Sequence, residues 1–315
     1  MNKDNFIIGG GPAGLIAAFY MEDYKVIDEK PLGQLKAPFI PGPRLLQFTP
    51  NMWSFVSEVM DAAGINPEMV VEQAKIGYNQ GHSYTPLPDI NYRKKYSEIT
   101  RGKTNSEDSH LSEGKNIIEH IILPEHGENT YKFVFETLLG IIEQRGQLLR
   151  CKVSALDLGK NAISLQHPGN QQVIKYNHII NTINLNIFKK LTDCDITGLE
   201  TLPKCFYQCK YDNLSDKMLK MRYSYVYSIS GEYTRKTYFK DYIVYETIEP
   251  IEGETVNGNE IISKVENLPI QIKESKNIKE IDGISMLGRF AMWSHKIKAN
   301  EVVDIVVKLK EEIYA

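Results

Sequence analysis

Hydrophobic and polar positions near the N-terminus predict a strand, a tight turn and a helix in immediate succession. The apolar run 6–8 leads directly into GGGPAG at 9–14, and the apolar stretch 15–19 follows. In a turn of the form G-x-G-x-x-G, the first glycine permits the turn, the second admits a pyrophosphate and the third lets helix and strand pack. The N–H groups of the helix N-terminus then face the phosphates. The residues expected to form this dinucleotide site are Gly9, Gly11, Pro12, Ala13 and Gly14.

A second strand is predicted at 25–27, and acidic residues end it. An acid at this point binds ribose hydroxyls in dinucleotide-binding folds; Glu29 is the better candidate and Asp28 is the alternative. Gly14 and Glu29 lie 15 residues apart, whereas about 20 is usual for this motif. We therefore expect the first helix to be one turn short.

Longer patterns predict elements in the rest of the chain. An amphipathic helix is expected over 131–144, and Thr49 is expected to cap a helix that begins with Pro50. Alternating apolar and polar residues over 223–245 indicate antiparallel strands. The polar segment 92–115 has few aliphatic residues, so we interpret it as a loop or lid whose basic side chains either face solvent or meet a phosphate.

The composition is that of an ordinary globular chain. Of the 315 residues, 42% are apolar and 24% charged, and the net charge of −3 gives no global reason to expect nucleic acid. No apolar window approaches the roughly 18 residues of a membrane span, and the first apolar run is too short for a signal peptide. The four cysteines are too few for a disulfide scaffold, and the histidines do not pair at metal-binding spacing. We therefore expect a cytoplasmic protein without a metal site or a membrane partner.

The residues after the second strand favour FAD as the cofactor. The segment EKPLGQ at 29–34 resembles the extension at this place in FAD enzymes of the glutathione-reductase type, above all in their amine-oxidase-like branch. Here the extension is shorter and retains one glycine. The resemblance implies cofactor contacts for Lys30, Gly33 and Gln34.

Two central segments resemble the same branch in the same order. Residues 146–153 are similar to the strand whose last residue, here Val153, places its backbone against the adenine. Residues 176–183, which include Thr182, are similar to the strand that closes the FAD domain. Both segments are therefore expected in the cofactor domain.

The C-terminal part continues the resemblance. Residues 283–289, with Gly288 and Arg289, resemble the last strand of the FAD domain, and a helix is predicted over about 300–312. In such enzymes the N-terminus of this helix, where Asn300 lies, points at the flavin pyrimidine and stabilises the anionic reduced flavin. Asn300 is therefore expected near the cofactor.

Other stretches resemble UDP-galactopyranose mutases, a family within this branch. The similar segments are GPRLLQFT at 42–49, YTR at 233–235 and LGRFAMW at 287–293. The first segment implies flavin contacts for Pro43, Arg44 and Leu45. Arg44 and Gln47 replace the two histidines of the mutase motif, and the chain is short by much of the mutases' helical substrate lobe. The resemblance thus implies a preserved flavin site and an altered sugar site.

These features together predict an α/β fold with two parts. A discontinuous Rossmann-like FAD-binding domain is expected at 1–50, 128–190 and 278–315. A smaller α+β substrate lobe with an antiparallel sheet is expected at 51–127 and 191–277.

Candidate catalytic residues follow from the resemblance and from side-chain chemistry. Arg289 is expected beside the flavin, or else in a salt bridge with a phosphate. Arg44 either presents its planar fork to a carboxylate or phosphate, or stabilises its own loop. His295 is the histidine closest in sequence to the flavin segment, and the one to test as a base. The residues expected to contact substrate are Arg235, which would bind an anionic end or else lie at the surface, Tyr233 and Trp293.

The leading functional prediction is an FAD-dependent oxidoreductase that transfers hydride from a small amine-bearing or similar substrate to flavin N5. One alternative is a non-redox flavoenzyme, either mutase-like or a phage-type lyase that acts on amino-acid-modified thymine in DNA. Another is a flavin-binding module without catalysis. The expected partner is a small-molecule substrate or a modified nucleotide, and the net charge of −3 does not favour DNA.

Overall fold

The computed structural model describes most of the chain, and a few predicted site residues fall outside it. The described residues are 4–33, 45–80, 84–85, 88–100, 116–167, 169–197, 199–229, 232–273, 281–292 and 297–314. The predicted site residues outside these ranges are Gln34, Pro43, Arg44, Trp293 and His295.

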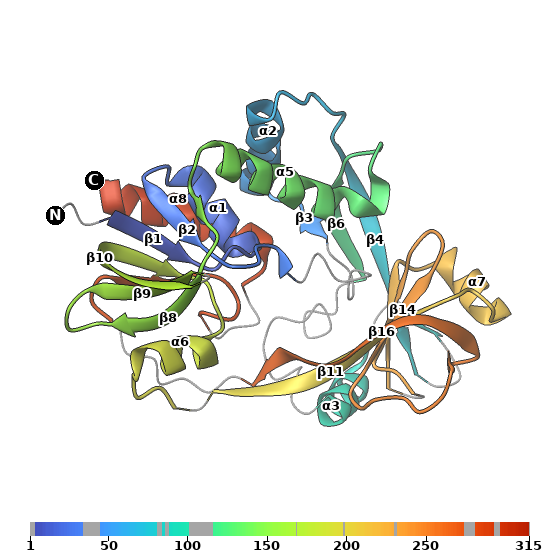
Figure 1. The fold of residues 1–315 in the computed structure, drawn as a ribbon. Coiled ribbons are helices and arrows are strands. Elements are labelled where there is room, and N and C mark those ends of the chain that lie inside the picture. Colours follow the sequence, from blue (N-terminus) through green and yellow to red (C-terminus); the bar gives the residue numbers. More distant parts are fainter. Residues whose placement is uncertain are drawn as a thin grey trace.

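The first sheet is of the Rossmann type and draws its strands from distant parts of the sequence (Figure 1). Its order is β7-β2-β1-β10-β9-β8, and β17 also pairs with β10. The pairs among β7, β2, β1, β10 and β17 are parallel, whereas β8, β9 and the first half of β10 form an antiparallel extension. The strands are β1 Asp4–Ile8, β2 Tyr24–Ile27, β7 Leu148–Leu149, β8 Lys152–Asp157, β9 Ala162–His167, β10 Asn170–Asn181 and β17 Ile284–Met286.

Four helices share one apolar core with this sheet. They are α1 Pro12–Tyr20, α2 Pro50–Ala62, α5 Thr130–Gln144 and α8 Ala299–Tyr314. The predicted helices over 131–144 and 300–312 are confirmed, and so is the cap of α2, because the Thr49 side chain accepts a hydrogen bond from Met52 N at 3.1 Å. At nine residues, α1 is short, as predicted. The helix α2 packs on α5 and α8, although the sequence assigned it to the substrate lobe.

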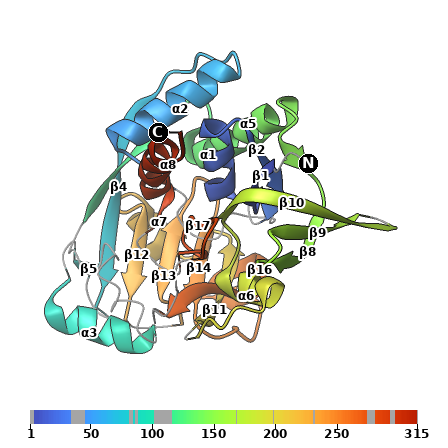
Figure 2. The same ribbon diagram turned by 90° about the vertical axis from the view of Figure 1, so that its left-hand side faces the viewer.

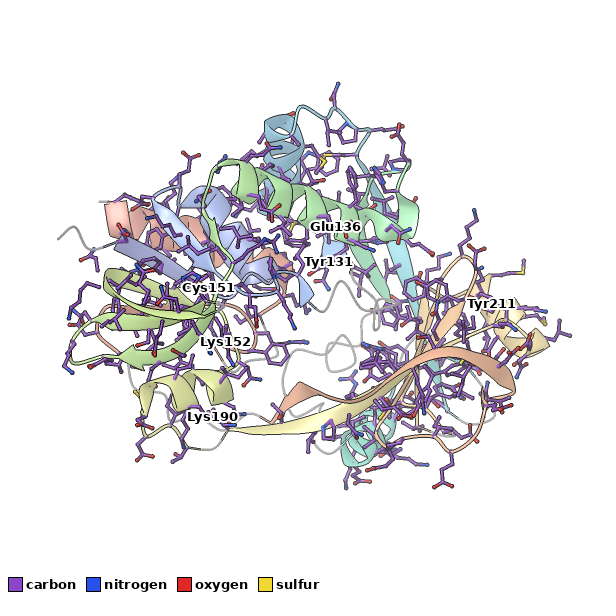
Figure 3. All side chains as sticks on the ribbon, viewed as in Figure 1. Tyr131, Glu136, Cys151, Lys152, Lys190 and Tyr211 are labelled. Carbon is purple, nitrogen blue, oxygen red and sulfur yellow. The ribbon has the colours of Figure 1, made fainter. Side chains whose placement is uncertain are left out.

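The single strand predicted over 146–153 is wrong, because the chain turns between two strands there. The first of them, β7, pairs parallel with β2, and the second, β8, pairs antiparallel with β9. At the turn, Cys151 N donates to Leu149 O at 3.0 Å, and Figure 3 marks Cys151 and Lys152 at this point. Val153 consequently lies on β8, buried opposite Leu165, and no longer on the parallel sheet.

The second sheet is larger and mixed, and it forms the other part of the molecule (Figure 2). Its order is β15-β16-β11-β14-β13-β12-β4-β6-β3, and β5 pairs with β4. The predicted antiparallel strands over 223–245 are confirmed as part of it. The strands are β3 Leu46–Gln47, β4 Val70–Asn79, β5 Tyr84–Thr85, β6 Ile117–Ile122, β11 Glu200–Cys209, β12 Tyr225–Ser228, β13 Arg235–Tyr238, β14 Ile243–Thr247, β15 Thr255–Val256 and β16 Asn259–Lys273.

Short helices cover the two faces of the large sheet. The helix α3 (Ile90–Ile99) packs on one face through Tyr92 and Tyr96, and α7 (Leu214–Lys220) covers the other. A further helix, α6 (Leu185–Thr192), packs in the core around β8–β10. The prediction of a loop over 92–115 is wrong for its first part, because Asp89 caps α3 by accepting from Tyr92 N at 2.7 Å. The remainder of that segment lies outside the described residues.

A fully buried ion pair fixes α7 to the sheet. Asp216 of α7 pairs with Lys236 of β13, and both side chains have 0% exposure. Its carboxylate also accepts from Tyr245 Oη at 2.6 Å and from Asn259 Nδ2 at 2.8 Å. Burial alone would raise the pKa of Asp216, but Lys236 and the neighbouring donors outweigh burial and lower it. The pair is therefore charged and well satisfied.

Lys236→Met is expected to destabilise the fold strongly. The substitution leaves the Asp216 carboxylate buried without its cation, a change that costs about 3–5 kcal/mol. Urea unfolding followed by circular dichroism measures this cost. Lys210→Met is the matched control, since Lys210 pairs with Glu260 at the surface, where an ion pair contributes little. Equal losses in the two variants would contradict the structural role of the buried pair.

Candidate functional site

Three parallel strands end side by side, and the segments that follow them form the first wall of the site. Ile8 of β1 is in register with Asn181 of β10, which is in register with Met286 of β17. Open α/β sheets bind ligands at the carboxyl ends of their strands. The segments at this edge are the glycine turn, Thr182 and the stretch 287–289, which the sequence predicted to contact the cofactor.

The glycines of the turn divide into two kinds. A Cβ on Gly14 would lie 1.9 Å from Gly9 O, and a Cβ on Gly9, whose φ is +107°, would lie 2.5 Å from Thr182 Oγ1. These two glycines are required by packing within the chain. A Cβ on Gly11 would meet no atom of the described residues within 4 Å. Gly11 therefore leaves open space where a pyrophosphate would approach.

The N-terminus of α1 is available to an anion. Gly11 is its N-cap, no side chain caps it, and Pro12 occupies the first turn. The side chain of Thr182 points instead at the strand, where its hydroxyl donates to Ile8 O at 2.9 Å. The first N–H groups of α1 therefore have no capping side chain among the described residues. The positive end of the helix dipole lies at the same place, beside the strand ends.

The two acids after β2 have different roles. Asp28 accepts from Gly10 N at 2.6 Å and from Lys30 N at 2.7 Å, so its carboxylate holds the glycine turn. Glu29 and Lys30 are exposed, as is Gly33. The geometry leaves Glu29, the preferred candidate, as the carboxylate open to a ribose.

The segment after β17 packs directly on α1. Gly288 has a φ of +87°, and a Cβ there would lie 2.8 Å from Ala13 Cβ, so this close approach requires glycine. Asn300, at the second position of α8, is 7% exposed, and its buried Oδ1 accepts no hydrogen bond from the part of the chain that the structure describes. A buried oxygen that accepts no hydrogen bond marks a position where a donor group of a ligand would fit.

The large sheet supplies a second wall, on the face opposite α7. Glu246 of β14 is 3% exposed and lies between two cations, with 2.9 Å from its Oε1 to Lys204 Nζ and 2.5 Å from its Oε2 to an Arg235 guanidinium nitrogen. Burial opposes the charge of Arg235, but Glu246 favours it, and the net effect raises the pKa of Arg235. The sequence did not single out Lys204 or Glu246, because an ion pair between separate strands leaves no local motif.

The predicted substrate residues Arg235 and Tyr233 do not lie together. Arg235 is largely buried, so the alternative of a surface arginine is wrong. Tyr233 packs on the α7 side instead: its ring stands 5.1 Å from that of Tyr245, and Lys236 Nζ lies 5.1 Å from its centroid. The geometry therefore does not support one substrate that contacts both Tyr233 and Arg235.

A layer of tyrosines adjoins Arg235 on the second wall. The Tyr227 ring stacks on Tyr78 at 5.7 Å and stands edge-on to Tyr96 at 5.5 Å. Burial raises the pKa of Tyr227, and the positive charges of Arg235 and, to a smaller extent, Arg289 partly offset that rise. Leu45, from the predicted flavin segment, packs against the same tyrosine cluster.

Two hydroxyls in this layer have no hydrogen-bond partner among the described residues. Tyr92 and Tyr96 come from α3 and are 2% and 0% exposed, and both Oη atoms are buried and unpaired. Burial raises the pKa of both phenols, so they stay neutral and able to donate. The sequence interpretation of 92–115 as a lid missed them, because a pair of buried tyrosines four residues apart is a weak periodic signal.

Comparisons with known proteins bear on the fold alone. No protein-family model matches the chain, and no curated protein matches it in sequence. Among solved structures, a fatty acid isomerase from P. acnes has a TM-score of 0.62 at 11% identity, over 100% of this chain and 99% of that one. A reduced UDP-galactopyranose mutase scores 0.58 at 12% identity over 98% and 96%, and a putrescine oxidase bound to putrescine scores 0.58 at 10% over 100% and 99%.

The chain has the fold of the FAD amine-oxidase-like enzymes. The two sheets, one largely parallel and one large and mixed, confirm the predicted α/β fold class. Within the described residues, no group of acidic, histidine and cysteine side chains is arranged to hold a metal ion, and no helix is long and apolar enough to cross a bilayer.

Removal of the unpaired tyrosine hydroxyls is expected to be harmless to the fold. Tyr92→Phe and Tyr96→Phe should leave the free energy of unfolding unchanged or raise it by up to about 1 kcal/mol, since each deletes a buried group without a partner. Tyr245→Phe is the control, because its hydroxyl bonds to Asp216 and its loss should cost about 1–3 kcal/mol. Urea unfolding of the ligand-free protein at neutral pH measures all three. A large loss in the α3 variants would show that their hydroxyls are paired in solution.

Proposed function

We propose that the chain is an FAD-dependent enzyme whose active site lies between the two walls. The supporting observation is the set of places left open at the strand ends: the space at Gly11, the uncapped start of α1 and the unpaired Oδ1 of Asn300. Each place matches a part of a dinucleotide flavin, and all three lie along the edge where such folds bind ligands.

The residues present fit FAD. The glycine turn and α1 would hold the pyrophosphate, Glu29 the ribose, and the N-terminus of α8 the pyrimidine end of the flavin. The residues that we assign to the cofactor are Gly9, Gly11, Gly14, Glu29, Lys30, Gly33, Leu45, Val153, Thr182, Gly288, Arg289 and Asn300. When bound, FAD supplies a two-electron hydride acceptor that no amino-acid side chain provides.

We assign to this site the oxidation of a carbon–nitrogen bond in a small amine-bearing substrate. The substrate carbon would give up one hydride, which carries both electrons, to the bound cofactor, and the nitrogen lone pair would complete the C=N bond of an iminium ion. Loss of an N–H proton to solvent would then give the neutral imine. The walls contribute by excluding water and by orienting the substrate, since buried tyrosines and Leu45 line the second one. A putrescine oxidase among the similar structures acts as a precedent for this chemistry on the fold.

The charges on the second wall favour a substrate that also carries an anionic group. Arg235 and Lys204 both point at Glu246 from neighbouring strands, and the Arg235 Nε is buried without an acceptor. A guanidinium presents its donors as a planar fork that suits a carboxylate or phosphate. An amino-acid-like substrate, with an amine and a carboxylate, matches both the chemistry and these donors.

A second candidate is a non-redox reaction on an anionic substrate, as in a mutase. The same two cations favour it, and a UDP-galactopyranose mutase is among the similar structures. The two candidates differ in their electron balance, because the mutase-type reaction leaves the flavin in the state in which it began. A DNA substrate has no support from the described residues.

Anaerobic mixing of the FAD-loaded protein with a substrate panel separates these reactions. The panel contains amino acids, polyamines, modified nucleosides and nucleotide sugars. Bleaching of the flavin by an amino acid supports the oxidoreductase. Turnover that requires prior reduction with dithionite, and consumes no further reductant, supports the mutase-type reaction. Retention of the protein on DNA that weakens with salt would support the lyase alternative instead.

Gly11→Val is expected to weaken cofactor binding without harming the fold. The new side chain occupies space that is empty in the protein, so the free energy of unfolding should change by about 1 kcal/mol or less, while the affinity for FAD should fall about tenfold or more. Isothermal titration with FAD measures the affinity. Gly140→Ala, in an open position of α5, is the control and should bind FAD normally. Normal binding by Gly11→Val would contradict the assigned pyrophosphate position.

Arg289→Ala is expected to lower either flavin occupancy or the rate of flavin reduction. Arg289 directly follows Gly288 after the last parallel strand, and its positive charge is one of the influences that lower the pKa of Tyr227. Flavin absorbance per chain and stopped-flow reduction report the two effects separately. Arg150→Ala, which removes an arginine paired with Glu143 at the surface, is the control. A variant that keeps full occupancy and full rate would remove Arg289 from the site.

A further inference from the structure

The helix α7 presents an apolar stripe to solvent at the outer end of the molecule. Leu214, Met218 and Met221 are 71%, 59% and 87% exposed. The helical conformation continues to Met221, whose φ and ψ are −68° and −18°. With 3.6 residues per turn, positions 214, 218 and 221 fall within an arc of about 60°. The opposite side of the helix carries Asp216 and Leu219, which are buried against the large sheet.

Basic residues border the stripe on one flank and at its C-terminal end. On the same helical projection, Lys217 falls on one flank of the stripe, and Arg222 follows the C-cap Met221 at the other end, where its N–H donates to Leu219 O at 2.9 Å. Both are exposed, and neither takes part in an ion pair within the described residues. Asp216 is the single acid between 214 and 222, and it is buried against Lys236. The exposed arc is therefore apolar in the middle and positive at these two borders.

The position of α7 leaves this arc accessible. Figure 1 shows α7 on the outer side of the large sheet, at the end of the molecule away from the Rossmann-like domain, and Figure 3 places Tyr211 beside it. Lys220 Nζ lies 4.6 Å from the Tyr211 ring centroid, which holds the base of the helix in place. A rigid, protruding helix with this distribution of side chains is suited to touch a flat surface.

We infer that α7 docks the protein peripherally on a membrane rich in anionic lipids. An interfacial helix inserts its apolar side chains at the headgroup boundary, while flanking lysine and arginine side chains reach the anionic headgroups. A second copy of the chain fits less well, since a symmetric contact would bring Lys217 and Arg222 of both copies together. Three apolar side chains are also few for a stable protein interface, which buries about 800 Å² on each partner. This inference departs from the expectation of no membrane partner.

Vesicle co-sedimentation of the full chain tests the inference. The protein should sediment with vesicles of phosphatidylglycerol and phosphatidylcholine, but not with phosphatidylcholine alone, and binding should weaken as salt is added. Met218→Ser/Met221→Ser and Lys217→Ser/Arg222→Ser should each lower the partition coefficient about tenfold. All four side chains are exposed, so circular dichroism should show both variants folded.

A matched control and two further outcomes complete the test. Ile187→Ser removes an apolar side chain that is 52% exposed on α6 and should leave vesicle binding unchanged. Failure to bind anionic vesicles, or binding that both double variants retain, would overturn the inference. A dimer in analytical ultracentrifugation that Met218→Ser/Met221→Ser dissociates would also overturn it, because α7 would then be an interface between copies.

Discussion

The site depends on backbone contacts that leave no room for a side chain. The first helix can sit on the first strand only because Gly14 has no Cβ, and the segment after the last strand reaches that helix only because Gly288 has none either. Through these contacts, residues near positions 10, 182 and 288 meet at one edge of the sheet. Close backbone packing builds this edge. It therefore fixes the positions of the open space at Gly11 and of the uncapped end of α1.

The opposite wall is organised by buried charge. Glu246 holds Lys204 and Arg235 on the inner face of the large sheet, while Asp216 holds Lys236 on the outer face. Because Arg235 and Lys236 are neighbours on one strand, their side chains project to opposite faces, and each ion pair supports the register of the other. The outer pair secures α7, and the inner group fixes two cations around one carboxylate on the inner face.

The features that the sequence could predict are those with local physical causes. The glycine turn, the Thr49 cap and the amphipathic helix of α5 each depend on residues close together in the chain. The break between β7 and β8 could not be predicted, because both halves are apolar and only their partners, β2 and β9, differ. The roles of Lys204 and Glu246, and the separation of Tyr233 from Arg235, likewise arise from pairing between strands.

The segments that the resemblance assigned to the cofactor lie together at one edge of the sheet, whereas the arrangement of the opposite wall came from the structure. Short motifs record backbone requirements, such as those of Gly9 and Gly14, because these tolerate few residue types. The side chains of the second wall, such as Arg235 and Tyr96, meet through contacts between distant elements, which many sequences can arrange in many ways. The fold and the cofactor site were therefore more predictable than the chemistry.

The central claim is that FAD binds at the ends of β1, β10 and β17. The visible absorption spectrum of the purified protein, before and after incubation with excess FAD and gel filtration, tests it most directly. We predict a flavin spectrum that corresponds to one FAD per chain. A protein that stays colourless after this treatment would contradict the claim and every reaction proposed for the site.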